Sequence, residues 1–78
     1  MDVEKKFKDI VADIFKIEVN KIKNSMDFVN DLHAKSIDII ALIAATENVF
    51  KIKTNAEETR KNRTVGQTIS YIKKKLKK

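Results

Sequence analysis

The chain has 78 residues, no cysteine, one histidine and a formal net charge of +6 at pH 7. This length predicts a single small domain, and the composition excludes disulfides, thiolate metal sites and a zinc site of several histidines, so we expect no bound metal. No apolar run approaches the roughly 18 residues that cross a bilayer, and the N-terminus lacks the apolar stretch of a signal peptide. We therefore expect a cytoplasmic domain without a membrane span, and we expect it to be a monomer.

The excess of positive over negative charge comes from the last third of the chain. Residues 1–50 carry 7 Lys or Arg and 9 Asp or Glu, whereas residues 51–78 carry 10 and 2. The excess is densest in residues 73–78, which we expect to be a frayed, lysine-rich tail of the single domain 1–78. A basic cluster indicates an alternative function, a non-enzymatic helical module that binds nucleic acid or an anionic membrane surface. That cluster comprises Arg60, Lys61, Arg63 and residues 73–78.

Residues 2–15 predict the first helix. Apolar residues recur there at i, i+4, i+7, i+8 and i+11, which places them on one face of a helix. Asp2 is a suitable N-cap, and Glu4 suits the positive end of the helix dipole. The apolar stripe, which we expect to be part of the core, consists of Val3, Phe7, Ile10, Val11 and Ile14.

Residues 16–35 show no sustained apolar period and contain turn-like Asn-Ser and Asn-Asp pairs. Connections longer than about 12–15 residues are uncommon in compact domains unless they are functional. The scattered apolar residues indicate that this connection is packed against the helices. It delivers the chain to Ser36, which is therefore a position of interest.

Residues 36–50 predict a second helix that is apolar on nearly every side, which is typical of a central helix. Its isoleucines would also suit a strand, but its length favours a helix. We expect its exposed positions to be Asp38, Glu47 and Asn48. Ser36 begins this helix, where unsatisfied N–H groups and the helix dipole favour negative charge. From local chemistry, Ser36 is either a plain N-cap or the carrier of a phosphate group.

Residues 51–54 predict a short extended segment, and Asn55 then caps a helix of one or two turns. Residues 64–67 form an S/T-x-x-Q capping box that begins a last amphipathic helix, in which Gly66 has no evident purpose. The stripe of that helix consists of Val65, Ile69, Ile72 and Leu76. Together the elements predict an all-α fold: a small antiparallel four-helix bundle with three longer helices, one short helix and a long first loop.

Three stretches of the chain resemble one family. Residues 28–38 read FVNDLHAKSID, which is similar to the F-x-x-D-L-G-x-D-S-L-D region of the acyl carrier protein family. Residues 47–50, ENVF, are similar to the end of that family's second helix, and residues 64–72, TVGQTISYI, to its last helix. The resemblance extends over nearly the whole chain.

The resemblance implies a function and a cofactor. The family's serine, here Ser36, receives 4′-phosphopantetheine from coenzyme A through a phosphopantetheinyl transferase. The arm holds acyl groups as thioesters and presents them to acyl-transferring and synthase enzymes of fatty-acid, polyketide or specialised lipid biosynthesis. Such a carrier is no enzyme, and it is not expected to bind nucleic acid. Its thiol belongs to the cofactor, which explains how a cysteine-free chain can carry thioesters.

The resemblance also implies two sets of contact residues. Partner enzymes dock on the family's second helix, and the corresponding residues here are Lys35, Ile37, Asp38, Ala41 and Glu47. Family members shelter the acyl chain between their helices, and an ordinary core role is an equal alternative for each candidate lining residue. Those candidates are Phe28, Ile39, Ile43 and Ile69.

Four positions depart from the family pattern. His33 replaces a glycine, but histidine tolerates positive φ better than most residues, so we expect a turn residue and not a catalytic base. Lys35 replaces an aspartate and dilutes the acidic docking helix, and Ile37 replaces a leucine. Asn62 places an amide where the family commonly has an apolar residue near the acyl chain. These changes favour a specialised carrier with dedicated enzymes, and a carrier-like fold that is never modified stays an alternative.

Overall fold

The computed structural model describes residues 2–77, with only the backbone of Ala56. Its four α-helices are α1 Val3–Phe15, α2 Ser36–Phe50, α3 Ala56–Lys61 and α4 Val65–Leu76. A single 3₁₀ turn, η1, covers Val19–Lys21. Within the described residues the only β-type pairing is an isolated bridge between Asp27 and Thr64. The prediction of an all-α fold with three longer helices and one short helix is confirmed.

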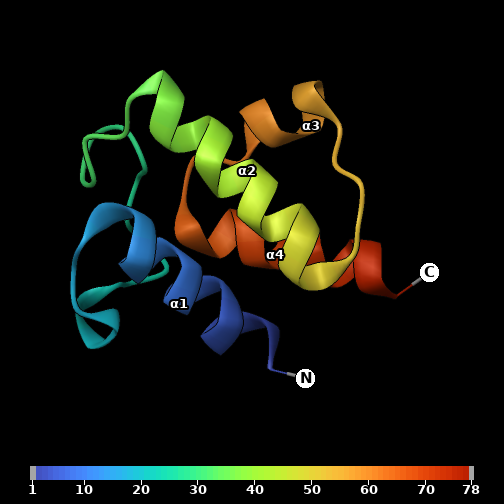
Figure 1. Ribbon diagram of the computed structural model, residues 1–78, viewed down its shortest axis with the longest axis horizontal. Helices are drawn as coiled ribbons and strands as arrows, with labels where there is room; N and C mark the ends of the chain where they lie inside the picture. Colours follow the sequence, from blue (N-terminus) through green and yellow to red (C-terminus); the bar gives the residue numbers. More distant parts are fainter. Residues whose placement is uncertain (1, 78) are drawn as a thin grey trace.

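Helix α1 packs against both α2 and α4 and runs in the opposite direction to them (Figure 1). Helices α2 and α4 run in the same direction, because residues 51–64 carry the chain back along the bundle. The short α3 belongs to this returning segment and lies beside α2, on the side away from α1 (Figure 1). Helix α1 is therefore the packing partner that the other two long helices share.

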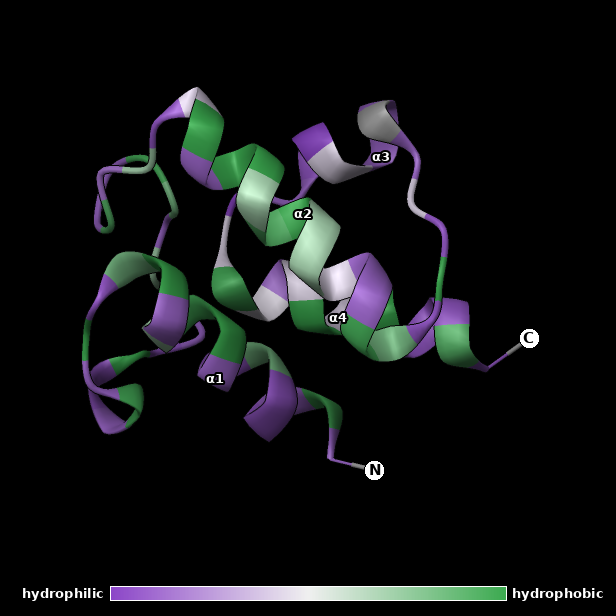
Figure 2. Cartoon of the chain, in the orientation of Figure 1, coloured by the Kyte–Doolittle hydropathy of each residue, from purple (hydrophilic) through white to green (hydrophobic). Residues whose placement is uncertain are grey.

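The core is formed mainly by the inner faces of α1 and α4. Phe7 and Val11 of α1 and Val65 and Ile72 of α4 have no exposed surface, as the two apolar stripes predict. The ring of Phe28, from the first connection, meets the Phe7 ring edge-on, with centroids 6.3 Å apart and planes at 80°. Aromatic pairs favour this geometry. Figure 2 shows hydrophobic and hydrophilic residues alternating along α1 and α4, as expected for helices that bury one face.

Helix α2 is not enclosed on every side, so the prediction of a central helix is wrong for one of its faces. Ile37 is 72% exposed and Ile40 is 66% exposed. The small side chains of Ala41 and Ala44 are also exposed and complete this face. The opposite face remains in the core, where the buried residues are Leu42, Thr46 and Phe50.

The first connection, residues 16–35, is fixed to residues 63–66, around the start of α4, by three backbone hydrogen bonds. They join Phe28 N–H to the Arg63 carbonyl at 3.0 Å, Val65 N–H to the Met26 carbonyl at 3.0 Å, and Gly66 N–H to the Asn24 carbonyl at 2.9 Å. A Cβ atom on Gly66 would lie 3.1 Å from the Asn24 carbonyl oxygen and 3.2 Å from Asn24 Cβ. This close approach explains a glycine that costs helix propensity.

The first lysines of the basic tail belong to the last helix. Residues 73–76 continue α4, which ends at Leu76, and the fraying expected of residues 73–78 stays a prediction. Lys75 Nζ lies 3.7 Å from Glu58 Oε1 and 5.6 Å from the centre of the Tyr71 ring. Lysines in a last turn also suit the negative end of the helix dipole. Lys78 lies outside the described residues.

Candidate functional site

Ser36 is exposed and is the first residue of α2. It is not the N-cap, because Lys35 holds that position with an extended backbone (φ −98°, ψ 171°). A lysine side chain cannot accept a hydrogen bond. The Asp38 carboxylate instead accepts a bond from the Lys35 N–H at 3.0 Å. The interpretation of Ser36 as a plain N-cap is therefore wrong, and its hydroxyl has no capping role.

The start of α2 has free hydrogen-bond donors. Within residues 2–77, no acceptor is recorded for the backbone N–H groups of Ile37 and Asp38. A serine or aspartate N-cap would occupy such donors, but the lysine leaves them open. Open N–H groups and the helix dipole together attract anions. The residues present therefore fit a phosphate attached to Ser36 Oγ.

The turn that leads to this serine is organised by Asp27. Its Oδ1 accepts hydrogen bonds from the N–H groups of Val29 at 2.8 Å and Asn30 at 2.9 Å. The bond from Asn30, followed by that from Val29, lowers the pKa of Asp27 because both stabilise the ionised carboxylate. In return, Asp31 Oδ2 accepts a bond from the Asp27 N–H at 2.7 Å. The turn is thus held by short local bonds to charged groups.

His33 lies in the left-handed region, at φ 56°. The expectation of a turn residue at the position of the family's glycine is therefore confirmed. Its N–H donates to the Val29 carbonyl at 3.1 Å, and the Ala34 N–H donates to the Phe28 carbonyl at 2.8 Å. Histidine is one of the few residues besides glycine enriched in this region, so the turn forms without a glycine.

The structure separates the five predicted docking residues into two groups. The exposed group comprises Lys35, Ile37 and Ala41. The carboxylates of Asp38 and Glu47 are instead engaged within the chain. Glu47 Oε2 accepts bonds from the Thr54 N–H at 2.9 Å and the Thr54 hydroxyl at 2.8 Å. The N–H bond first, and then the hydroxyl bond, lowers the pKa of Glu47, so this acidic group stabilises the fold.

Ile40 belongs to the same exposed face, and sequence reasoning missed it. It follows Ile37 by three residues and precedes Ala44 by four, so the three side chains share one side of α2. Val29, in the turn before α2, is also 57% exposed. The spacing of these residues was visible in the sequence, but a helix that is apolar all round does not reveal which side faces solvent.

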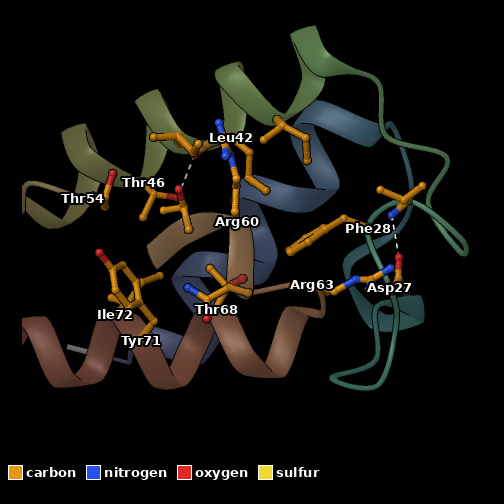
Figure 3. A pocket seen from close by; sticks show the side chains of 15 residues that line it. Asp27, Phe28, Leu42, Thr46, Thr54, Arg60, Arg63, Thr68, Tyr71 and Ile72 are labelled. Atoms are coloured by element: carbon orange, nitrogen blue, oxygen red, sulfur yellow. Dashed lines mark hydrogen bonds and ion pairs between the residues drawn. The ribbon is translucent and has the colours of Figure 1, made fainter. Parts of the chain in front are cut away.

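A cavity of about 260 Å³ lies between α2 and α4, with α3 and the first connection at its sides (Figure 3). Three of the four candidate lining residues border it: Phe28, Ile39 and Ile43. Ile69 does not border it, because it packs into the core with 4% of its surface exposed. Figure 3 shows the Phe28 ring pointing into the cavity. Asn62, which the resemblance places near the acyl chain, also borders the cavity. Sequence reasoning missed other polar residues of the wall, among them Thr46, Thr54, Thr59, Thr68 and Tyr71.

Helix α3 is joined to α4 by Tyr71. The Tyr71 hydroxyl donates to Glu58 Oε1 at 2.8 Å and accepts from the Asn55 N–H at 3.3 Å. Burial, and then the bond to Glu58, raises the pKa of Tyr71. Side-chain bonds therefore hold the part of the second connection, residues 51–64, that contains α3 against α4.

Metal sites and membrane spans are both absent from the described part of the chain. Residues 2–77 contain no group of three or more His, Cys, Asp or Glu placed to hold a metal ion. None of the helices described is both long enough and apolar enough to cross a membrane.

Comparison with known proteins points to one family. Residues 5–72 match the family model described as the phosphopantetheine attachment site. The chain is 46% identical over 77 residues to the acyl carrier protein of Buchnera aphidicola, a match that covers 99% of this chain and 98% of that protein. It is 44% identical over 71 residues to the acyl carrier protein of Clostridium acetobutylicum, covering 91% and 92%.

A solved structure agrees with these matches. The fold is similar to that of the acyl carrier protein from Enterococcus faecalis, with a TM-score of 0.81 and 27% identity, over 95% of this chain and 94% of that one. None of these comparisons supports the alternative of a nucleic-acid-binding module. The chain therefore belongs to the acyl carrier protein family and is a carrier protein whose cofactor is phosphopantetheine.

Proposed function

We propose that this carrier bears its arm on Ser36, holds acyl groups there as thioesters and presents them to enzymes of fatty-acid or related polyketide and lipid biosynthesis. One observation carries the proposal: an exposed serine begins a helix whose first N–H groups have no acceptor within residues 2–77. In this proposal the chain itself catalyses no reaction. Its cytoplasmic location and monomeric state stay predictions from the sequence.

The residues around Ser36 have distinct roles in this proposal. Ser36 gives up its hydroxyl proton to a base of the transferase, and its Oγ attacks the pantetheine-bearing phosphorus of coenzyme A. The new Oγ–P ester bond forms as the P–O bond of the pyrophosphate bridge breaks, and adenosine 3′,5′-bisphosphate leaves. The N–H groups of Ile37 and Asp38 and the ammonium group of Lys35 stabilise the negative charge of that phosphate. The bound arm supplies the thiol that a cysteine-free chain lacks.

The cavity is the proposed shelter for the acyl chain. Ile39 follows Ser36 by three residues, a rise of about 4.5 Å along the helix, so the cavity wall begins within one turn of the attachment point. Phe28 and Ile43 extend the apolar wall from there. Burial of a hydrocarbon chain against such side chains is favourable, and it shields the thioester from water.

We expect the partner enzymes to recognise an apolar, weakly basic face and not an acidic helix. Ile37 and Ile40 are exposed beside Ser36, and Lys35 precedes it. The carboxylate of Asp38 is engaged in the fold. A partner that fits has an apolar groove with acidic side chains at its rim, because apolar contact supplies affinity and charge supplies orientation. This expectation covers a dedicated transferase as well as the acyl-transferring enzymes.

The attachment site is tested by intact mass. The protein is incubated with coenzyme A and a promiscuous phosphopantetheinyl transferase, and the wild type is expected to gain one arm. Ser36→Ala is expected to gain none, whereas Ser25→Ala and Ser70→Ala, which alter exposed serines elsewhere, are expected to be modified like the wild type. An arm on Ser36→Ala, or none on the wild type, would contradict the proposal.

A further inference from the structure

The cavity contains a polar side chain that the fold leaves unpaired. Asn62 lines the cavity, and its Nδ2 atom is buried without a hydrogen-bond partner among the described residues. The residue is the C-cap of α3, where its backbone N–H donates to the Thr59 carbonyl at 3.1 Å. Its backbone is therefore fixed and only the side-chain amide is unsatisfied. Buried amide groups are nearly always paired in folded proteins, and an unpaired one costs stability.

Other polar side chains of the cavity wall are used within the fold. Thr46 Oγ1 donates to the Leu42 carbonyl at 2.8 Å, and Thr68 Oγ1 donates to the Thr64 carbonyl at 3.1 Å. The hydroxyl groups of Thr54 and Tyr71 donate to the carboxylates of Glu47 and Glu58. The Asn62 amide differs from all of them, since the fold gives its Nδ2 no acceptor.

We propose that Asn62 selects acyl groups with an oxygen atom on the chain, such as hydroxyacyl or oxoacyl groups, by donating a hydrogen bond from Nδ2 to that oxygen. The inference rests on the proposed function, because the acyl group must reach the cavity from an arm on Ser36. A plain hydrocarbon chain fills the cavity against Phe28, Ile39 and Ile43 but leaves the amide buried and unpaired. An oxygenated chain fills the same space and also pairs the amide.

The test compares matched acyl groups on the intact protein. The arm is loaded with hexanoyl, β-hydroxyhexanoyl or δ-hydroxyhexanoyl groups. The rate at which hydroxylamine cleaves each thioester is then measured and divided by the rate for the corresponding free acyl-pantetheine. We expect the thioester of at least one hydroxyacyl group to be cleaved about 2- to 10-fold more slowly than the hexanoyl thioester. A difference of this size corresponds to one net hydrogen bond. The NMR signals of the Asn62 side-chain amide are expected to shift with that hydroxyacyl group and not with hexanoyl.

Two variants isolate the amide. In Asn62→Leu the order is expected to reverse, so that the hexanoyl thioester is the better protected one. Asn48→Leu, which replaces an exposed asparagine of α2, is expected to keep the wild-type order. The NMR measurement uses the wild-type protein, so it decides the matter even if Asn62→Leu does not fold.

The outcomes separate this inference from the proposed function. Equal protection of all three thioesters, or an Asn62 amide whose signals do not respond to the hydroxyl group, overturns the selection by Asn62. Intact mass then still shows each acyl arm in place, so the carrier function stands. Failure of the wild type to gain any arm overturns the proposed function and this inference with it.

Discussion

The two connections of the bundle are held in different ways. Residues 16–35 are joined to residues 63–66, around the start of α4, by backbone hydrogen bonds, and Phe28 from this segment is buried in the core. Residues 51–62, which contain α3, are held by side-chain bonds from Thr54 to Glu47 and from Tyr71 to Glu58. One connection is built into the core, and the other is attached to it from outside.

This difference separates two tasks of a carrier. The attachment serine follows a connection whose backbone is fixed, so Ser36 is presented in one place. The wall that α3 gives to the cavity rests on the exposed bonds of Tyr71 to Asn55 and Glu58. Such bonds open at a lower free energy than backbone pairing beside a core residue such as Phe28. We expect the cavity wall to adjust to acyl chains of different length while the attachment point stays in place.

The largest effect is expected from Phe28→Ala, which removes the anchor of the first connection. Phe28 is 4% exposed and packs edge-on against Phe7, and such a truncation costs about 3–5 kcal/mol in the free energy of unfolding. Urea denaturation measures the loss. Val29→Ala, the neighbouring change at a position that is 57% exposed, is expected to alter stability by less than about 0.5 kcal/mol. Similar values for the two variants would show that the connection is not part of the core.

Gly66→Val tests the close approach of the first connection to α4. The Cβ atom alone would lie 3.1 Å from the Asn24 carbonyl oxygen, closer than an ordinary van der Waals contact, and crowding of this kind destabilises by about 1–3 kcal/mol. Ser70→Val, at an exposed position of the same helix, is the control and is expected to have a much smaller effect. Thermal unfolding distinguishes them. A Gly66→Val protein as stable as the control would mean that the two backbones separate at little cost.

Lys35→Asp acts where the first connection ends. An aspartate at the N-cap accepts bonds from the first N–H groups of α2, so we expect a gain of about 1 kcal/mol in the free energy of unfolding. It removes the ammonium group and fills the N–H groups that favour the phosphate, but it also gives the transferase a negative charge beside Ser36 to dock on. We expect docking to decide the rate, so loading by a general-purpose transferase is expected to be faster, by roughly several-fold. Lys23→Asp makes the same charge change at another exposed position of this connection. An unchanged loading rate in Lys35→Asp would count against specialised partners.

The smallest effect concerns the second connection and its pH dependence. Bonds from Thr54 lower the pKa of Glu47 below its ordinary value of 4.5. The carboxylate therefore contributes stability above about pH 4.5, and this contribution is lost as the pH falls through the lowered pKa. Glu47→Gln is expected to lose less stability than the wild type on acidification, as denaturant curves at several pH values can show. Glu57→Gln, at an exposed position, is the control. If Glu47→Gln lost as much stability on acidification as the wild type, that result would contradict this role of Glu47.

Much of the fold follows from periodicity in the sequence. An amphipathic helix has one apolar side that can be buried, so the stripes of α1 and α4 predict which residues enter the core. Four residues of these stripes have no exposed surface: Phe7, Val11, Val65 and Ile72. The exposure of Ile37 could not be found in this way, since α2 offers apolar residues on every face. Tertiary packing, not local pattern, decides which of them faces water.

The candidate site was only partly predictable for similar reasons. Ser36 at a helix start could be predicted from local signals and from the resemblance, whereas its N-cap could not, because lysine is an unusual residue for that role. The purpose of Gly66 depends on Asn24, which is far away in the sequence. The unpaired state of Asn62 depends on every group around it, and no single-sequence pattern reports that.

The central claim is that the attachment point at Ser36 is fixed while the α3 wall of the cavity adjusts to the acyl chain. Amide hydrogen exchange, compared between the arm-bearing protein and its acylated form, tests this claim most directly. We predict slow exchange of Phe28, Val65 and Gly66 N–H in both forms, and exchange in α3 that is fast in the first form and slower once an acyl chain is loaded. Exchange in α3 that is unaffected by acylation, or fast exchange at Phe28, Val65 and Gly66, would contradict the account.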